Sequence, residues 1–153
     1  CQDNEISWLN WDDLEKNQDL YHFFRYMIHF RKKHPILRCH TRPAKSRFPE
    51  TSLHAMTPWD ANYQYDSRVI GVTFAGRNIQ DTEDDIVHIV MNAHWEGHQV
   101  CLPELPEGKC WYIAVNTFNG PDSDCIENVE DMQCVRSGIL WVQPRSVMIL
   151  VAQ

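Results

Sequence analysis

The 153-residue sequence has little of what several protein classes require. Its 6 glycines and 8 prolines are too few for a fibrous or low-complexity chain. No apolar run approaches the roughly 20 residues that span a bilayer, so we expect no membrane-crossing segment. Lys and Arg number 14 against 21 Asp and Glu, which gives a formal net charge of −7. Because nucleic acid is usually bound by a basic face, we expect no nucleic-acid partner, whereas a neutral sugar would be indifferent to this charge.

Local signatures of common active sites, metal sites and cofactor sites are missing as well. The chain has no Gly-x-Ser-x-Gly, no glycine-rich phosphate loop and no Cys-x-x-Cys. The segment His94-Trp-Glu-Gly-His98 lacks the His-Glu-x-x-His order of zinc proteases, and its strand-like flanks predict a hairpin. The acidic run over residues 81–85 lacks the spacing of a calcium loop and predicts a solvated turn. We therefore expect no catalytic residue, no metal and no cofactor in this chain.

The cysteines and the first residue bear on the compartment. Six cysteines in this length are too few for a disulfide scaffold, so we expect reduced, mostly buried thiols in a cytoplasmic protein. Cys1 at the start leaves two alternatives, a mature lipoprotein or a piece of a longer protein. A lipoprotein normally continues with a polar tether, whereas Trp8 and Trp11 follow almost at once, which favours the piece.

Residues 12–34 have the pattern of an amphipathic helix. Apolar side chains recur at the spacing that places them on one face: Leu20, Phe23, Phe24, Met27 and Ile28. Acidic residues 12–13 suit the beginning of the helix and basic residues 31–33 suit its end, where Pro35 stops it. The polar stretch 17–19 can break it into a short piece and a long one.

After Arg38 the pattern changes to short β-rich runs separated by turn signals, following a loop predicted over residues 41–50. Six strands are predicted: Val69–Ala75, Ile86–Met91, Gln99–Leu102, Trp111–Val115, Ile139–Val142 and Val147–Ala152. Such spacing without helices between the strands predicts a mainly β fold, an antiparallel β-sandwich preceded by one or two helices. We divide the chain into residues 1–38 and residues 39–153.

Six tryptophans are many for a chain of this length. Sugar rings stack on exposed indole faces, and Trp59 and Trp95 adjoin polar turn residues, which makes them candidates for sugar stacking. The alternative, which we favour, is that they anchor loops or fill the core. We expect a core position more strongly for Trp111 and Trp141, because both lie within predicted strands.

The most specific signal is Cys-Gln-Asp-Asn-Glu-Ile-Ser-Trp at residues 1–8. It resembles the segment that follows the eighth barrel strand in isoamylase-type glycogen and starch debranching enzymes of the α-amylase superfamily. Further stretches resemble the same family in the same order: residues 23–37, 66–76, 89–96, 102–117 and 145–150. The resemblance therefore covers nearly the whole chain.

This resemblance implies a fold, a parent activity and a role for the chain. Residues 1–38 would be the end of the catalytic (β/α)8 barrel, and residues 39–153 the C-terminal β-sandwich called domain C. The parent would be a retaining glycoside hydrolase that cleaves α-1,6-glucosidic branch points in glycogen or starch-type glucans. Because the family's catalytic carboxylates precede this region, the chain would be a non-catalytic portion that packs on and stabilises the barrel. The protein would be bacterial.

The resemblance also implies partners and site residues. Residues 2–8 would lie at the C-terminal face of the barrel, where barrel active sites are built. Asp3, Asn4 and Glu5 would therefore support the substrate cleft, more by bracing it than by touching sugar. The partners would be α-glucan, reached through the parent enzyme, and the catalytic barrel.

Two further expectations follow from the helix and from the sandwich. The helix face would pack partly on the sandwich and partly on the barrel, so an isolated chain would expose apolar surface and self-associate. The alternative function is an autonomous carbohydrate-binding β-sandwich that tethers the enzyme to α-glucan.

Overall fold

The computed structural model describes residues 2–38, 42–61, 63–64, 66–77 and 83–153. Helical elements come first: α1 (Asp13–Lys16), α2 (Gln18–Lys33) and the 3₁₀ turn η1 (Pro35–Leu37). The strands follow, with one 3₁₀ turn among them: β1 (Thr51–His54), β2 (Val69–Gly76), β3 (Asp85–Asn92), β4 (His98–Cys101), β5 (Trp111–Asn116), η2 (Val129–Asp131), β6 (Gln133–Val135), β7 (Ile139–Val142) and β8 (Ser146–Ala152). None of the helices in these ranges combines the length and the apolar character that crossing a membrane needs.

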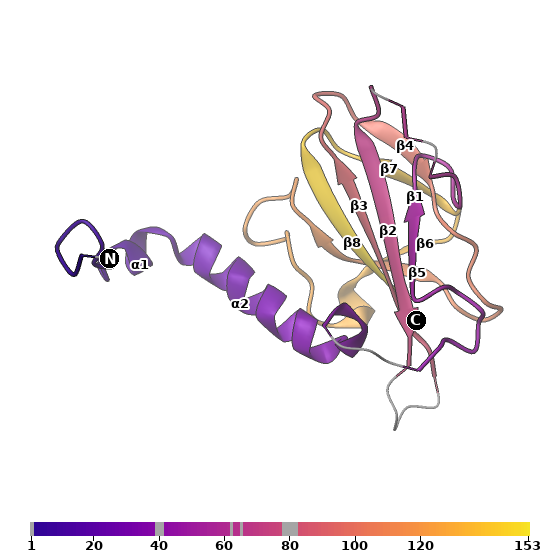
Figure 1. Cartoon of the computed structure of the whole chain (residues 1–153), viewed down its shortest axis with the longest axis horizontal. Coiled ribbons are helices and arrows are strands. Elements are labelled where there is room, and N and C mark those ends of the chain that lie inside the picture. Colours follow the sequence, from indigo (N-terminus) through magenta and orange to yellow (C-terminus); the bar gives the residue numbers. More distant parts are fainter. Residues whose placement is uncertain (1, 39–41, 62, 65, 78–82) are drawn as a thin grey trace.

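Two antiparallel sheets form the β-sandwich (Figure 1). The large sheet has six strands in the order β1-β2-β3-β8-β5-β6, and the small sheet pairs β4 with β7. Strand β8, the last in sequence, lies in the middle of the large sheet, between β3 and β5. The predicted mainly β, antiparallel fold is confirmed, and each of the six predicted strands is found with ends that agree within one residue.

Both faces of the large sheet are buried. Along β3, Ile86 and Val90 face the small sheet, whereas Val87 faces helix α2, as the two-residue period of a strand requires. Along β8, Leu150 likewise faces the small sheet and Val151 faces helix α2. The inner side chains of the small sheet complete the first core: Val100, Leu140 and Val142. Helix α2 and the segment around η2 complete the second core, with Phe30 and Met132.

Polar contacts fasten helix α2 to the sheet at two points. The Tyr26 hydroxyl donates to the carbonyl oxygen of Ile126 at 2.9 Å and lies 3.3 Å from that of Ala114. Burial raises the pKa of this hydroxyl far above its ordinary value, so it stays a donor. Beyond the end of α2, His34 Nδ1 lies 2.7 Å from Asp85 Oδ1 at the start of β3. The helix is thus held by its buried face and by its C-terminal end.

The helical segment agrees with the sequence in its main features. The break that the stretch 17–19 predicts falls at Asn17, which separates α1 from α2. The single predicted face is divided, because Phe23 and Met27 pack against the second core while Leu20, Phe24 and Ile28 stay exposed. Figure 1 shows the N-terminal part of this segment standing away from the sandwich.

Two short strands were not predicted. Strands β1 and β6 both lie at edges of the large sheet, where one neighbour supplies all the pairing. Thr51–His54 has a single aliphatic residue, so its composition carries no strand signal. The predicted loop is found over residues 42–50, apart from an isolated bridge between Arg42 and Arg77, and Thr41 lies outside the described residues.

The prediction of a solvated turn over residues 81–85 is wrong for its described part. Asp84 accepts hydrogen bonds from the backbone N–H groups of Lys45 at 2.8 Å and Ser46 at 2.7 Å. Burial raises the pKa of Asp84, but hydrogen bonds from Ser46 and Lys45 outweigh burial and hold the pKa below its ordinary value. Asp85 contacts the helical segment, so both carboxylates fasten other segments to the start of β3. Asp81 lies outside the described residues.

The described cysteines carry free thiols: Cys101, Cys110, Cys125 and Cys134. Cys101 is exposed and the other three are half-buried, so the expectation of mostly buried thiols is wrong for these four. Cys1 and Cys39 lie outside the described residues.

Alanine at Phe30 or at Phe24 tests whether α2 is attached by one face. Phe30 is 5% exposed, whereas Phe24, on the same helix, is 59% exposed. Phe30→Ala leaves a cavity in the second core, so we expect the free energy of unfolding to fall by about 3–5 kcal/mol. The matched change Phe24→Ala should alter it by less than about 0.5 kcal/mol. Urea denaturation measures both, and equal losses would contradict the one-sided attachment.

Candidate functional site

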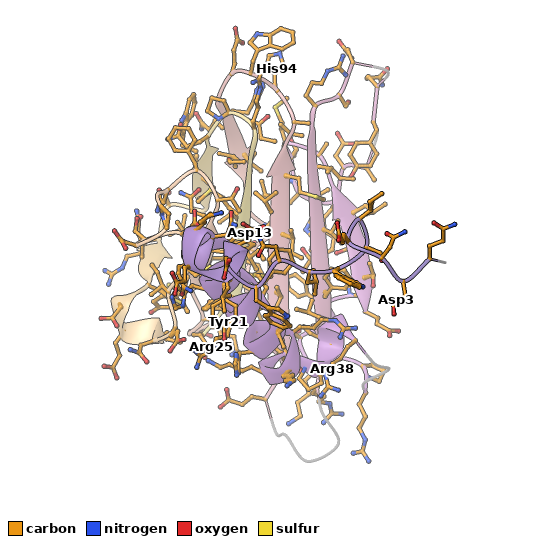
Figure 2. All side chains as sticks on the ribbon, turned by 90° about the vertical axis from the view of Figure 1, so that its left-hand side faces the viewer. Asp3, Asp13, Tyr21, Arg25, Arg38 and His94 are labelled. Carbon is orange, nitrogen blue, oxygen red and sulfur yellow. The ribbon has the colours of Figure 1, made fainter. Side chains whose placement is uncertain are left out.

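The candidate site is a pocket of about 490 Å³ at one end of the sandwich. One wall comes from the β1–β2 connection and the other from the turn between β3 and β4. Most of the side chains that line it are polar, among them Asp60, Gln64, Asp66, Arg68, His94 and His98. Figure 2 shows His94 at the opposite end of the sheet from Arg38, which follows helix α2.

The turn between β3 and β4 is not a hairpin, so this prediction is wrong. Strand β3 belongs to the large sheet, whereas β4 pairs with β7 in the small sheet. The turn therefore carries the chain from one sheet to the other. Both flanks read correctly as strands, but a local pattern does not say which partner each strand takes.

The Asn92 side chain fixes this turn. Its Nδ2 donates to the carbonyl oxygens of Glu96 at 2.8 Å and Gln143 at 2.9 Å, and its Oδ1 accepts the His94 N–H at 2.9 Å. Asn92 is buried, so these bonds replace the water that its amide would otherwise hold. At Gly97 a Cβ atom would lie 2.6 Å from Trp141 Cζ2, so only glycine lets the indole pack on this backbone.

Two histidines of the turn contact each other at the pocket wall. His98 Nε2 lies 2.9 Å from His94 Nδ1, a hydrogen bond in which one nitrogen donates and the other accepts. The Trp95 ring lies against the His94 ring, with centroids 4.3 Å apart. The turn thus holds an exposed indole on an imidazole that is itself hydrogen-bonded.

A chain of hydrogen bonds runs from the other wall into the core. The backbone N–H of Trp59 donates to His54 Nδ1 at 2.9 Å, which places the His54 proton on Nε2. His54 Nε2 lies 2.9 Å from Thr73 Oγ1, which in turn lies 2.8 Å from His88 Nδ1. Trp59 has a φ of +64°, a backbone conformation that non-glycine residues adopt only when their surroundings impose it.

The two histidines that these hydrogen bonds connect, His54 and His88, are held neutral. Burial, followed by the charge of His54, lowers the pKa of His88 to about 3, and burial lowers the pKa of His54. His88 Nε2 has no hydrogen-bond partner in the described structure. A Cβ atom at Gly71 would lie 3.1 Å from His88 Cε1, so Gly71 gives this ring its space.

The four tryptophans singled out in the sequence differ in their positions. Trp59 and Trp95 are 52% and 68% exposed, and each directly adjoins in sequence a residue that lines the pocket, Asp60 and His94 respectively. The Trp59 ring also packs on His54 and Phe48, as a loop anchor would. Trp111 is buried, as predicted. Trp141 is 55% exposed, so its predicted core position is wrong.

Asp3, Asn4 and Glu5 form an exposed turn at the far end of the N-terminal segment (Figure 1). Asp3 accepts a hydrogen bond from the Trp8 indole, and Asn4 Oδ1 accepts the Ile6 N–H at 3.1 Å. This turn is organised by its own side chains and backbone. Its role in a substrate cleft stays a prediction.

Sequence reasoning missed the pocket itself. Its polar walls come from two connections far apart in sequence, which only the pairing of the strands brings together. The polar residues of the β1–β2 connection are typical of any surface loop, so their composition alone does not indicate a binding site. In the part of the chain that the structure describes, no group of three or more His, Cys, Asp or Glu side chains is placed to hold a metal ion.

Comparisons with known proteins were made on sequence and on fold. No protein-family model matches the chain. The chain is 25% identical over 167 aligned residues to the "glycogen operon protein GlgX homolog" of Mycobacterium bovis and of Mycobacterium tuberculosis. The match covers 98% of this chain and 22% of each relative, so the chain spans about a fifth of their length.

The fold resembles part of a crystal structure of type I pullulanase from Bacillus subtilis complexed with maltose. The TM-score is 0.61 and the identity 19%, over 95% of this chain and 17% of the pullulanase chain. The sequence match confirms the predicted resemblance, and the likeness to the pullulanase agrees with it in fold.

Acid should destabilise the chain well above the pH at which carboxylates titrate. Unfolded histidines bind a proton near pH 6.5, whereas folded His88 does so only near pH 3. Stability linked to neutral His88 is therefore complete above pH 6.5 and is lost as the pH falls toward 3, by up to about 1.4 kcal/mol per pH unit. Denaturation at several pH values measures the slope. An NMR titration in which the His88 ring protonates near pH 6.5 would contradict this expectation.

Alanine at Gly97 tests the packing of the β3–β4 turn. The new Cβ would overlap the Trp141 ring, so the indole or the turn must move, and we expect a loss of about 1–3 kcal/mol of stability. Gly120→Ala is the matched control, because nothing lies within 4 Å of a Cβ there. Thermal unfolding and the indole N–H signals measure both, and an unshifted Trp141 signal in Gly97→Ala would contradict the packing.

Proposed function

We propose that the chain is the non-catalytic C-terminal portion of a glycoside hydrolase that cleaves α-1,6-glucosidic branch points in glycogen or starch-type glucans. The match to glycogen operon proteins carries this proposal, because it runs over 98% of the chain yet over only 22% of the relatives. The likeness to a pullulanase fold supports it. On this proposal the catalytic carboxylates lie in a barrel domain outside residues 2–153.

The outer face of helix α2 supports packing on such a barrel. Leu20, Phe24 and Ile28 recur every four residues, and each is more than half exposed. They lie beside the face that covers the sheet, so α2 has two adjacent apolar stripes. One partner needs an apolar stripe of only about 100°. A helix with two such stripes is suited to burial between two bodies, with the sandwich on one side.

The apolar surface continues onto the segment before α2. Its large apolar side chains are exposed: Ile6, Trp8, Leu9, Trp11 and Leu14. Contiguous apolar surface of this kind usually marks an interaction site. We propose that this segment and the outer face of α2 pack together on the catalytic barrel and stabilise it. In the isolated chain the same surface would drive self-association.

The turn at residues 3–5 fits a bracing role on this proposal. The Asp3 carboxylate and the Asn4 amide are both engaged within the turn, which leaves Glu5 at its surface. These side chains would hold the shape of the segment at the edge of the substrate cleft, and α-glucan would be met through the barrel. The free thiols of the described cysteines fit our further proposal of a bacterial, cytoplasmic protein.

A second candidate function is an autonomous carbohydrate-binding sandwich that tethers the enzyme to α-glucan. The observation that favours it is the pocket with its many polar side chains, together with the exposed Trp59 and Trp95 next to its lining residues Asp60 and His94 in sequence. The two functions are compatible, because the pocket and the outer face of α2 use different residues.

Hydrolysis of glycogen tests the first function. We expect the intact parent protein to release linear chains from glycogen, measured as new reducing ends, and the 153-residue chain to release none. Hydrolysis by the isolated chain would contradict the non-catalytic role. An intact protein that leaves branched glucan uncut would contradict the debranching assignment.

Charged side chains on the outer face of α2 test the docking surface. Because Phe24 and Ile28 are exposed, we expect Phe24→Glu and Ile28→Glu to abolish self-association of the isolated chain, seen by sedimentation velocity, at a cost below about 1 kcal/mol in its stability. In the intact parent protein the same changes should lower the melting temperature.

The matched control is His22→Glu, because His22 is exposed and lies two residues before Phe24, on the opposite side of the helix from the outer stripe. It should leave both the sedimentation of the chain and the melting temperature of the parent nearly unchanged. A parent protein equally stable with Glu at residues 24 and 28 would contradict the docking surface.

A further inference from the structure

We propose that the pocket between the β1–β2 connection and the β3–β4 turn binds a segment of an α-glucan chain. The α-glucan identity rests on the proposed function, whereas the preference for a saccharide comes from the pocket itself. At about 490 Å³ the pocket has the size of ordinary small-molecule sites.

The lining suits a neutral ligand that carries many hydroxyl groups. The lining contains two carboxylates, Asp60 and Asp66, and one guanidinium, Arg68, so the pocket has no excess of positive charge for an anion. The described residues also contain no group of three side chains that could hold a metal ion. Carboxylates accept hydrogen bonds, a guanidinium donates them, and amides and hydroxyls do both. A sugar hydroxyl also does both, which matches this mixture.

The histidine pair adds a matched donor and acceptor. Because His98 Nε2 and His94 Nδ1 share one proton at 2.9 Å, two neutral rings leave one further N–H and one further lone pair for a ligand. Which ring carries which depends on the tautomers, but the pair offers both in either arrangement. Two different hydroxyl groups of a saccharide can use them, one donating to a ring nitrogen and the other accepting from a ring N–H.

The indole beside the pocket is held before a ligand arrives. Trp95 lies on the His94 ring, in a turn whose backbone Asn92 fixes, and yet the indole is largely exposed. An aromatic ring held in place by its neighbours loses little conformational entropy on binding. Across the pocket, Trp59 is held by His54 in a left-handed backbone conformation. Sugar rings that leave the pocket past His94 would meet the Trp95 indole.

Titration of the isotopically labelled chain with maltoheptaose tests the proposal by NMR. We expect saturable shifts of the Trp95 indole N–H and of the amides that line the pocket. Loss of the stacking ring in Trp95→Ala should raise the dissociation constant about tenfold. Asp66→Asn removes an exposed carboxylate without changing its shape, so it should also weaken binding while the spectrum stays dispersed.

Trp11→Ala is the matched control, because Trp11 is equally exposed but lies on the N-terminal segment away from the sandwich (Figure 1). It should leave the dissociation constant unchanged. No saturable binding by the folded chain, or binding that Trp95→Ala and Asp66→Asn leave unaltered, would overturn this site. Neither result would affect the debranching assignment, which the glycogen assay on the intact protein tests separately.

Cellohexaose, whose glucose units have β-1,4 links, tests the identity of the sugar. We expect maltoheptaose to bind at least about tenfold more tightly, because a helical α-linked chain and a flat β-linked chain present different faces to the two indoles. Equal binding would overturn the α-glucan assignment of the pocket and leave a saccharide site of another class.

Discussion

The central strands β3 and β8 are apolar on both faces, and the rest of the structure follows from covering them. A sheet that is buried on both sides needs two covers, because each exposed face would leave a row of aliphatic side chains in water. The small sheet of β4 and β7 covers one face, and helix α2 with the segment around η2 covers the other. Helix α2 is therefore part of the β domain's core, even though it comes from the N-terminal segment.

The same constraint creates the pocket. Since β3 belongs to the large sheet and β4 to the small one, the chain must cross between the layers directly after Asn92. That crossing exposes backbone groups which no strand can pair, and the Asn92 amide satisfies two of them, in addition to the Gln143 carbonyl of the β7–β8 connection, from a buried position. The turn is thereby rigid enough to hold Trp95 and the histidine pair at the rim. On the facing wall, the bonds from Trp59 to His54, Thr73 and His88 tie the loop to the core of the large sheet.

Much of the fold could be predicted from the sequence, because its longest strands have a strong local pattern. The runs around Val87 and Ile149 are dense in β-branched residues, and the breaks between them carry turn residues. What the pattern lacks is pairing: it showed β3 and β4 as neighbours in a hairpin, whereas they lie in different sheets. Trp141 was misplaced although the alternation of Ile139–Val142 contained the answer, with Leu140 and Val142 inside and Trp141 outside. The pocket was not predictable, because it exists only where two distant connections meet.

The two proposed surfaces differ in the physics that each would use. The outer face of α2 is apolar and wide, so its contribution to docking would come from the apolar area that is removed from water. The pocket combines polar side chains with apolar surface, so part of its contribution would come from a few directed hydrogen bonds, which give specificity more than affinity. A chain with both surfaces would bind the proposed catalytic barrel firmly and a glucan loosely. This combination suits a part of an enzyme whose polymeric substrate must be kept near and then released.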